Sequence, residues 1–159
     1  MATQMPPDAS TIYRRYLDAV GLHGHAVAEA AGLHTTDWYA LSILALAGSL
    51  TSGELAERTN LTTGATTRLI DRLESAGHVR RVRDSADRRR VVIEPTPDWA
   101  PKVDAVVGPA RQYIGDILAS YTPDQLEVLF DYFARAAPAF HKATAEIRQN
   151  SADQRRHDT

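Results

Sequence analysis

The sequence predicts a mainly α-helical fold in which four helices and one β-hairpin form a compact unit, with further helices on both sides of it. Three observations lead to this fold class. Apolar residues recur at helical spacing through most of the chain. Helix-capping residues separate the helical segments, and a short β-branched segment at 91–93 follows a charged turn. At 159 residues, the chain can bury one core and extend helices beyond it.

Helix-capping residues place most of the element boundaries. Thr51 and Glu54 have the spacing of a capping box, in which a hydroxyl and a carboxylate bind the free N–H groups of the first turn. Gly77 can end the fourth helix, because glycine readily adopts the left-handed conformation. Thr122 can cap the last helix, with Pro123 as its first residue. The helices are therefore expected over residues 10–31, 35–47, 52–59, 62–75, 98–120 and from 123 toward 149.

The two flanking helical regions carry more apolar surface than a monomer normally exposes. Tyr13 and Leu17 recur in the first helix, and Leu129, Phe130 and Phe133 recur in the last. We therefore expect these regions to form a homodimer. The predicted organisation is a disordered lead over 1–9, an N-terminal dimerisation helix over 10–34, the helical unit with its hairpin over 35–97, C-terminal dimerisation helices over 98–149 and a disordered tail over 150–159.

Several classes of protein are excluded by composition. Without cysteine there is no disulfide framework, thiolate nucleophile or cysteine zinc site. The longest mainly apolar stretch, 38–50, is too short for a membrane span, and the N-terminus has no secretory signal, so a cytoplasmic protein is expected. No nucleophile motif, glycine-rich phosphate loop or metal-ligand spacing is present. We expect neither an enzyme nor a bound cofactor or metal.

The charge distribution is uneven along the chain. The net charge is −2, yet residues 62–94 contain eight Arg against five acidic residues, which leaves this segment at +3 and the remainder at −5. Concentrated basic charge in an otherwise acidic protein indicates one surface that meets phosphate.

The helix expected over residues 62–75 has two different faces. Thr66, Leu69, Ile70 and Leu73 follow helical spacing and should face inward. The opposite face near the N-terminus carries small or hydroxylated side chains and one long cation, which lets the backbone approach DNA closely. A helix N-terminus also binds phosphate through its free N–H groups. The residues expected to contact DNA from this face are Thr62, Thr63, Gly64, Ala65, Thr67 and Arg68.

Arg72, one turn further along, has two open interpretations. Together with Arg68 it can contact phosphate, which we favour, or it can pair within the protein with Asp71 or Glu74.

The tip of the hairpin is basic. Arg88, Arg89 and Arg90 can reach a minor groove, which is narrow and electronegative in A/T-rich DNA. Asp87 is unsuited to contact DNA and is expected to orient a neighbouring arginine by a charge-assisted hydrogen bond. Two short helices, a tight turn between them and a basic hairpin form a winged helix-turn-helix, which predicts double-stranded DNA as a partner. The alternative for the arginines is a merely solvated hairpin.

Residues 32–96 resemble the MarR family of multiple-antibiotic-resistance-type regulators. The matching features are ELAER, TRLIDRLESAGHVRR and an Asp-Arg-Arg hairpin tip. The resemblance implies a homodimer with interlocking terminal helices, whose paired winged helices read a palindrome. It also implies that the recognition helix starts at 62–68, that Arg88 enters the minor groove and that Asp87 supports Arg88. Thr63 and Gly64 stand where the family often has Pro and Ser.

A small-molecule site is a further hypothesis. Trp38, Tyr39 and His23 can line a pocket for an aromatic or phenolic effector, which some relatives bind, although core packing is the alternative for Trp38. His23 and His25 do not suggest a metal site, because residues two apart on a helix point about 200° apart.

Taken together, these residues predict a sequence-specific DNA-binding transcriptional regulator. The interpretation is a homodimeric repressor of a palindromic operator, relieved by a small molecule. The alternative is a winged-helix protein-interaction module that does not bind DNA.

Overall fold

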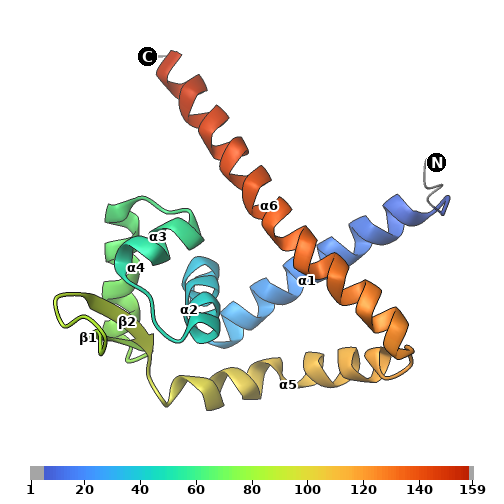
Figure 1. Ribbon diagram of the computed structural model, residues 1–159, viewed down its shortest axis with the longest axis horizontal. Helices are drawn as coiled ribbons and strands as arrows, with labels where there is room; N and C mark the ends of the chain where they lie inside the picture. The colour runs from blue at the N-terminus through green and yellow to red at the C-terminus, as the bar shows by residue number, and fades with distance from the viewer. Residues whose placement is uncertain (1–5, 158–159) are drawn as a thin grey trace. The chain divides into compact units, whose positions relative to one another are not determined.

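The computed structural model describes residues 6–157, apart from the side chains at 100, 102, 152, 153 and 155–157. The elements follow the predicted order (Figure 1). The described residues up to Gly108 form one compact unit, and those from Pro109 onward form a second. The elements are α1 (Ala9–Ala30), α2 (Thr35–Ala47), α3 (Ser52–Thr59), α4 (Thr63–Ser75), β1 (Val79–Arg83), β2 (Val91–Pro95), α5 (Trp99–Leu118) and α6 (Pro123–His157).

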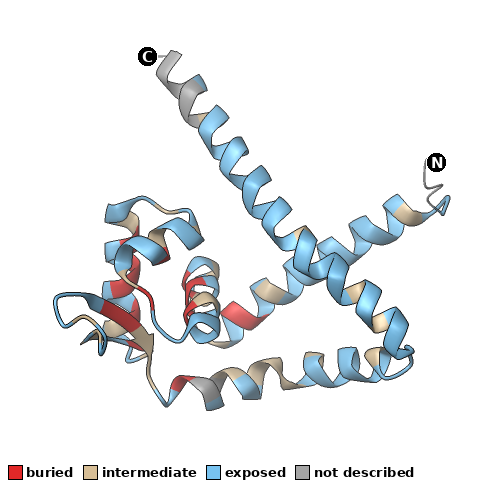
Figure 2. Ribbon diagram, viewed as in Figure 1, coloured by how far each residue is buried: buried red, intermediate tan, exposed pale blue. Residues whose placement is uncertain are grey.

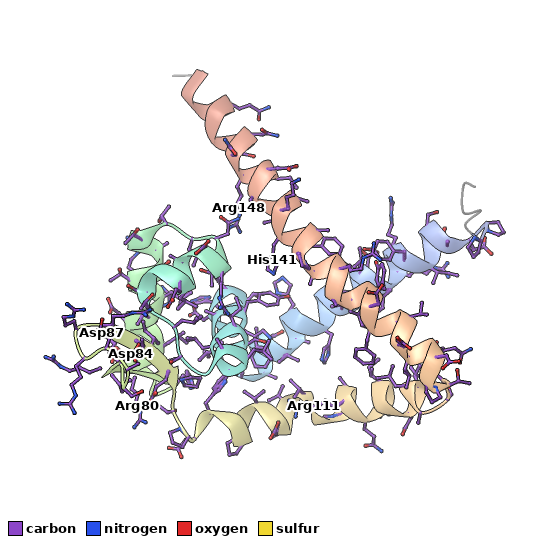
Figure 3. The ribbon with its side chains drawn as sticks, viewed as in Figure 1. Arg80, Asp84, Asp87, Arg111, His141 and Arg148 are labelled. Atoms are coloured by element: carbon purple, nitrogen blue, oxygen red, sulfur yellow. The ribbon has the colours of Figure 1, made fainter. Side chains whose placement is uncertain are left out.

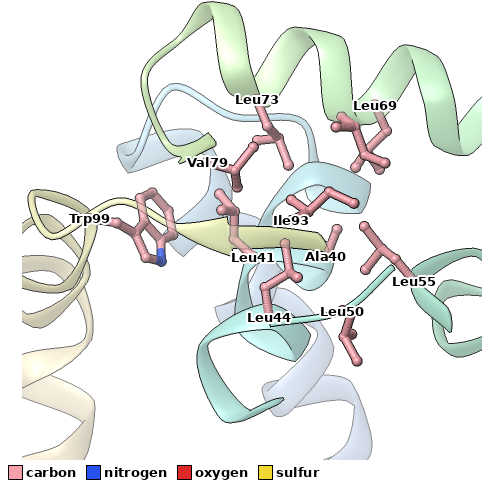
Figure 4. Packing of buried hydrophobic residues seen from close by; sticks show 11 residues of the cluster. Ala40, Leu41, Leu44, Leu50, Leu55, Leu69, Leu73, Val79, Ile93 and Trp99 are labelled. Atoms are coloured by element: carbon pink, nitrogen blue, oxygen red, sulfur yellow. The ribbon is translucent and has the colours of Figure 1, made fainter. Parts of the chain in front are cut away.

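The hydrophobic core of the first unit joins α2, α3, α4, the hairpin and the start of α5. Each large aliphatic side chain buried there contributes about 1.5–3 kcal/mol, so these elements hold together as one body. The buried members are Ala40, Leu41, Leu44, Leu50, Leu55, Leu69, Ile70, Leu73, Val79, Ile93 and Trp99, most of which are labelled in Figure 4.

The caps predicted at Thr51, Gly77 and Thr122 are confirmed, and Thr62, which was expected as the first residue of its helix, is a further cap. Thr51 and Glu54 form a complete capping box at the start of α3. The Thr62 hydroxyl accepts a hydrogen bond from the Ala65 N–H at 3.3 Å, which fixes the start of α4. Gly77 has φ 72°, the left-handed conformation expected after the fourth helix. The Thr122 hydroxyl accepts from the backbone N–H of Gln125 at the start of α6.

The hairpin is antiparallel and is joined to the loop before α3. Arg83 at the end of β1 lies opposite Val91 at the start of β2. On the other side of β2, Leu50 and Ile93 exchange backbone hydrogen bonds of 3.0 and 2.7 Å. The hairpin is therefore fixed to the helix-turn-helix by backbone hydrogen bonds near its base.

The C-terminal end differs from the prediction. A disordered tail was expected over 150–159, but α6 continues to His157. The polar composition of this segment was taken as the end of a helix, although it contains neither glycine nor proline, the two residues that most strongly interrupt helices. At the other end, the disordered lead was expected over 1–9, and α1 begins at Ala9. Residues 1–5 and 158–159 lie outside the described part of the chain.

Large apolar side chains lie exposed on α1 and, separately, in the second unit. Figure 2 shows both α1 and α6 as mostly exposed along their lengths. On α1 the exposed residues are Ile12, Tyr13, Tyr16, Leu17, Val20 and Leu22; in the second unit they include Tyr113, Ile114, Ile117, Val128, Phe130, Phe133 and Phe140. Among the described helices, none is long and apolar enough to cross a membrane.

Candidate nucleic-acid interface

The two faces of α4 lie as the sequence predicted. Thr66, Leu69, Ile70 and Leu73 are buried. The candidate contact residues on the opposite side, Thr62, Thr63, Gly64, Thr67 and Arg68, are exposed, and Ala65 is half-buried. The structure therefore presents a polar, small-residue surface at the first turns of this helix.

Local hydrogen bonds shape this surface. The Thr67 hydroxyl donates to the Thr63 carbonyl at 3.0 Å, which turns its methyl group outward from that bond. A Cβ added at Gly64 would meet no atom within 4 Å, so this position is open. Within the described part of the chain, the Arg68 guanidinium has no hydrogen bond or ion pair, which leaves it available for phosphate.

The Arg72 side chain requires a correction. Phosphate contact was favoured, with Asp71 or Glu74 as possible intramolecular partners. Instead, its Nε and Nη2 atoms donate to the two carboxylate oxygens of Asp37 at 3.2 and 2.6 Å. The Asp37 side chain is only 4% exposed, and this hydrogen bond raises the pKa of Arg72 above its ordinary value. Because a buried carboxylate needs a cation, we remove Arg72 from the candidate DNA contacts.

Two arginines of β1, which are outside the predicted contacts, also form ion pairs within the protein. Arg81 pairs with Glu74 and, at 2.6 Å, with Asp71, both on α4. Arg80 donates to Glu94 across the hairpin at 2.7 Å. The Arg81 pairs join β1 to α4, and the Arg80 pair joins the two strands of the hairpin.

The hairpin tip, residues 84–90, is an ordered turn. The Asp84 carboxylate accepts from the backbone N–H groups of Ala86 and Asp87 at 2.8 and 3.4 Å. The Asp84 N–H donates to the Arg90 carbonyl, and the Arg90 N–H donates to the Asp87 carbonyl. Figure 3 shows Asp84 and Asp87 together at this end of the hairpin. The turn is thus held by backbone hydrogen bonds and by the Asp84 carboxylate.

Asp87 supports Arg89 rather than Arg88. Its carboxylate accepts from the backbone N–H of Arg89 at 3.0 Å, from Nε at 3.2 Å and from Nη2 at 3.4 Å. These bonds from Arg89 lower the pKa of Asp87. The Arg89 side chain is nevertheless 91% exposed. The prediction that Asp87 orients a neighbouring arginine is confirmed. The resemblance implied that this arginine is Arg88, whereas in the structure it is Arg89, two positions after Asp87.

The remaining two tip arginines differ from each other. Arg88 is exposed, and in the described part of the chain its guanidinium has no partner, while its carbonyl accepts from Arg83. Arg90 instead donates to Glu54 on α3 at 3.2 Å. The tip therefore offers one oriented arginine, one unpaired arginine and one that is bound to the protein.

Arg58 was missed by the sequence analysis. It lies in the last turn of α3, is exposed, and has no hydrogen bond or ion pair within the described residues. Its position in the first helix of the helix-turn-helix was the available signal, because that helix crosses the DNA backbone in such folds.

The candidate effector residues do not share a described cavity. Trp38 is half-buried against the core, with its ring 5.9 Å from that of Trp99, so core packing holds for it. Tyr39 is exposed and its hydroxyl lies against Gly24, since a Cβ there would be 2.8 Å away. His23 is exposed. No cluster of three potential metal-ligating side chains was found among the described residues.

A cavity of about 310 Å³ lies elsewhere in the first unit. The His78 ring packs edge-on against Trp99 at 5.0 Å on its wall. The remaining lining is apolar and comes from the end of α1 and the first turns of α5. The lining residues are Ala30, Ala31, His78, Trp99, Val103, Ala105 and Val106.

Comparisons with known proteins agree with this geometry. The model of the MarR family matches residues 31–90. The chain is 35% identical to the uncharacterized HTH-type transcriptional regulator YcgE of Bacillus subtilis (strain 168), over 92% of this chain and 96% of that protein. It is 30% identical to the transcriptional activatory protein BadR of Rhodopseudomonas palustris, over 77% of this chain and 74% of that protein.

Solved structures show the same fold. NadR in complex with 4-hydroxyphenylacetate superposes with a TM-score of 0.62 at 22% identity, covering 86% of this chain and 96% of that one. At this identity the likeness concerns the fold alone. With the family model, the full-length relative and the winged helix in agreement, the chain belongs to the MarR family of DNA-binding transcriptional regulators.

Proposed function

We propose that the protein is a homodimeric repressor that binds a near-palindromic operator. The observation that carries this proposal is the pairing of an open α4 surface, with Arg68 unpaired, and a hairpin tip whose Arg88 and Arg89 are exposed. An α4 N-terminus of this kind suits a major groove, and exposed tip arginines suit the adjoining minor groove.

Dimerisation follows from the exposed apolar residues of α1 and of the second unit. Side chains such as Tyr13, Leu17 and Phe130 would be costly to leave in water on a monomer. A two-fold dimer places its two recognition helices in successive major grooves, about 10 base pairs apart.

The test is selection of DNA. Duplexes that bind the protein are enriched from random sequence, and affinity is then measured by fluorescence anisotropy at several salt concentrations. If each subunit neutralises about four phosphates, the slope of log K against log salt is about −7. If the protein is instead an interaction module that does not bind DNA, the selection should enrich no sequence, and the recovered duplexes should share no inverted repeat.

Repression, rather than activation, is the proposed outcome of binding. The relative BadR is named an activator, so the direction needs its own experiment. Transcription in vitro from a promoter that contains the selected operator should decrease when the protein is added. An increase would contradict repression while leaving operator binding intact.

We also propose that an aromatic or phenolic acid releases the protein from DNA. The structural neighbour NadR was solved with 4-hydroxyphenylacetate. Of the three candidate residues, Tyr39 and His23 are exposed and stay candidates, whereas Trp38 packs against the core. The cavity beside His78 and Trp99 is a second place for such a molecule. Titration with 4-hydroxyphenylacetate should quench tryptophan fluorescence and weaken operator binding together. If neither tryptophan fluorescence nor operator affinity changes, this compound is excluded as the effector. We propose no catalytic reaction.

A further inference from the structure

The Glu54 carboxylate makes contacts in two directions. Its Oε2 atom accepts from the Thr51 backbone N–H and from the Thr51 hydroxyl, both at 2.7 Å, as part of the α3 capping box. Its Oε1 atom accepts from Nη2 of Arg90 at 3.2 Å. Thirty-six residues separate Glu54 from Arg90 in the chain. One carboxylate thus joins the first turn of α3 to the hairpin.

This contact occupies a particular place on the hairpin. Ile93 is already fixed to Leu50 by backbone hydrogen bonds, and Arg90 lies three residues further toward the tip. Within the described residues, no other hydrogen bond or ion pair joins the tip, residues 84–90, to an element outside the hairpin. The internal turn contacts of Asp84 and Asp87 keep the tip in shape but do not fix its direction.

We propose that Glu54 is a positioning residue, which holds the hairpin tip at the angle to α3 and α4 required for both grooves to be contacted at once. This inference rests on the proposed operator binding. Arg89, the tip arginine proposed to enter the minor groove, directly precedes Arg90, which is bound to Glu54. A change in the direction of Arg90 therefore moves the Arg89 side chain. The half-exposed pair contributes little to folding stability, which separates a positioning role from a structural one.

Simple electrostatics predict the opposite sign. DNA is a polyanion, so removing a carboxylate near the binding surface should strengthen binding. If Glu54 positions the wing, Glu54→Gln should weaken operator binding although it removes a negative charge. Glutamine is also accepted in a capping box, so the start of α3 survives the change.

Glu57 supplies the matched control. It lies on the same helix and is exposed, and within the described residues its carboxylate has no hydrogen bond or ion pair. Glu57→Gln makes the same change of charge without touching the hairpin. We expect Glu54→Gln to weaken affinity for the selected operator about two- to fivefold per half-site, the range for a half-exposed ion pair, and Glu57→Gln to leave it equal or stronger. Equal behaviour of the two variants would overturn the proposal.

A double-mutant cycle tests the route through Arg90. In an Arg90→Gln background, Glu54→Gln should have no further effect on operator affinity, because the contact is already absent. A full additional loss would mean that Glu54 acts through another group. Melting temperatures of all variants should agree closely with that of the wild type; a fall for Glu54→Gln alone, proportionate to its affinity loss, would assign it a structural role.

Hydrogen exchange separates this inference from the proposed function. In the DNA-free protein, amide exchange over residues 84–90 should accelerate in Glu54→Gln and not in Glu57→Gln. If no duplex is enriched by the wild type, the proposed function fails, while faster exchange in Glu54→Gln alone still supports the anchoring of the tip. Unchanged exchange together with normal operator binding would overturn the anchoring and leave the proposed function standing.

Discussion

Replacing Arg89 by alanine is expected to weaken operator binding more than replacing Arg88. The Asp87 carboxylate holds the Arg89 side chain by two bonds, at 3.2 and 3.4 Å, while 91% of that side chain stays exposed. These bonds favour one rotamer before DNA arrives, so less side-chain entropy is lost when Arg89 enters a groove. Arg88, adjacent to it, has no such support.

The expected magnitudes follow from these two environments. Loss of an oriented groove contact costs about 1–3 kcal/mol per half-site, most strongly on duplexes with A/T-rich flanks. Loss of Arg88, if it contacts phosphate, weakens binding evenly across sequences and reduces the salt slope by about 1 per subunit. Both are surface substitutions, so folding stability should change by less than about 0.5 kcal/mol.

The assay is fluorescence anisotropy on two operator duplexes that differ only in A/T content beside the half-sites, for the wild type, Arg88→Ala and Arg89→Ala. Melting temperature serves as the control for folding. The reasoning is refuted if Arg89→Ala binds both duplexes as the wild type does. It is equally refuted if Arg88→Ala carries the larger, A/T-dependent loss, because Asp87 would then orient a side chain that DNA does not use.

Three further outcomes are expected. Arg72→Met leaves the buried Asp37 carboxylate without its cation and should lower the free energy of unfolding by about 2 kcal/mol, a fall in melting temperature of about 4–8 °C. Arg68→Met should keep the wild-type melting temperature and lose DNA affinity. The reverse pattern would contradict the assignment of the two arginines. Leu17→Glu places a charge on the exposed apolar face of α1 and should yield a monomer in light scattering, while a dimer of unchanged stability would place the interface elsewhere. Acid should release Arg89 from Asp87 in the DNA-free protein. Because the folded-state pKa of Asp87 is lowered, the contact is complete above the usual aspartate range and is lost as pH falls through the lowered value. An NMR titration of the Arg89 side-chain N–H should show this step, and Asp87→Asn should remove it.

Much of the fold followed from local signals. The capping pair Thr51–Glu54, the cap at Thr122 and the left-handed Gly77 each act within a few residues, so the sequence carries them in readable form. The buried side of α4 follows from helical periodicity in the same way. The predicted end of the last helix was wrong, because α6 continues to His157. A polar composition indicates that a helix surface is exposed to solvent, but it does not indicate where the helix ends.

The sequence by itself determined the order of the elements, the polar and buried faces of α4 and the basic character of the hairpin tip. Only the tertiary structure decided which arginines remain available. Arg72 binds Asp37 across 35 residues, Arg90 binds Glu54 across 36, and Asp87 binds Arg89 instead of Arg88. A chain with 18 basic and 20 acidic residues allows many opposite-charge pairings, and long flexible side chains form those that packing brings within about 3 Å. Distance along the chain does not contain that information, because the core of α2, α3, α4 and the hairpin sets which segments become neighbours.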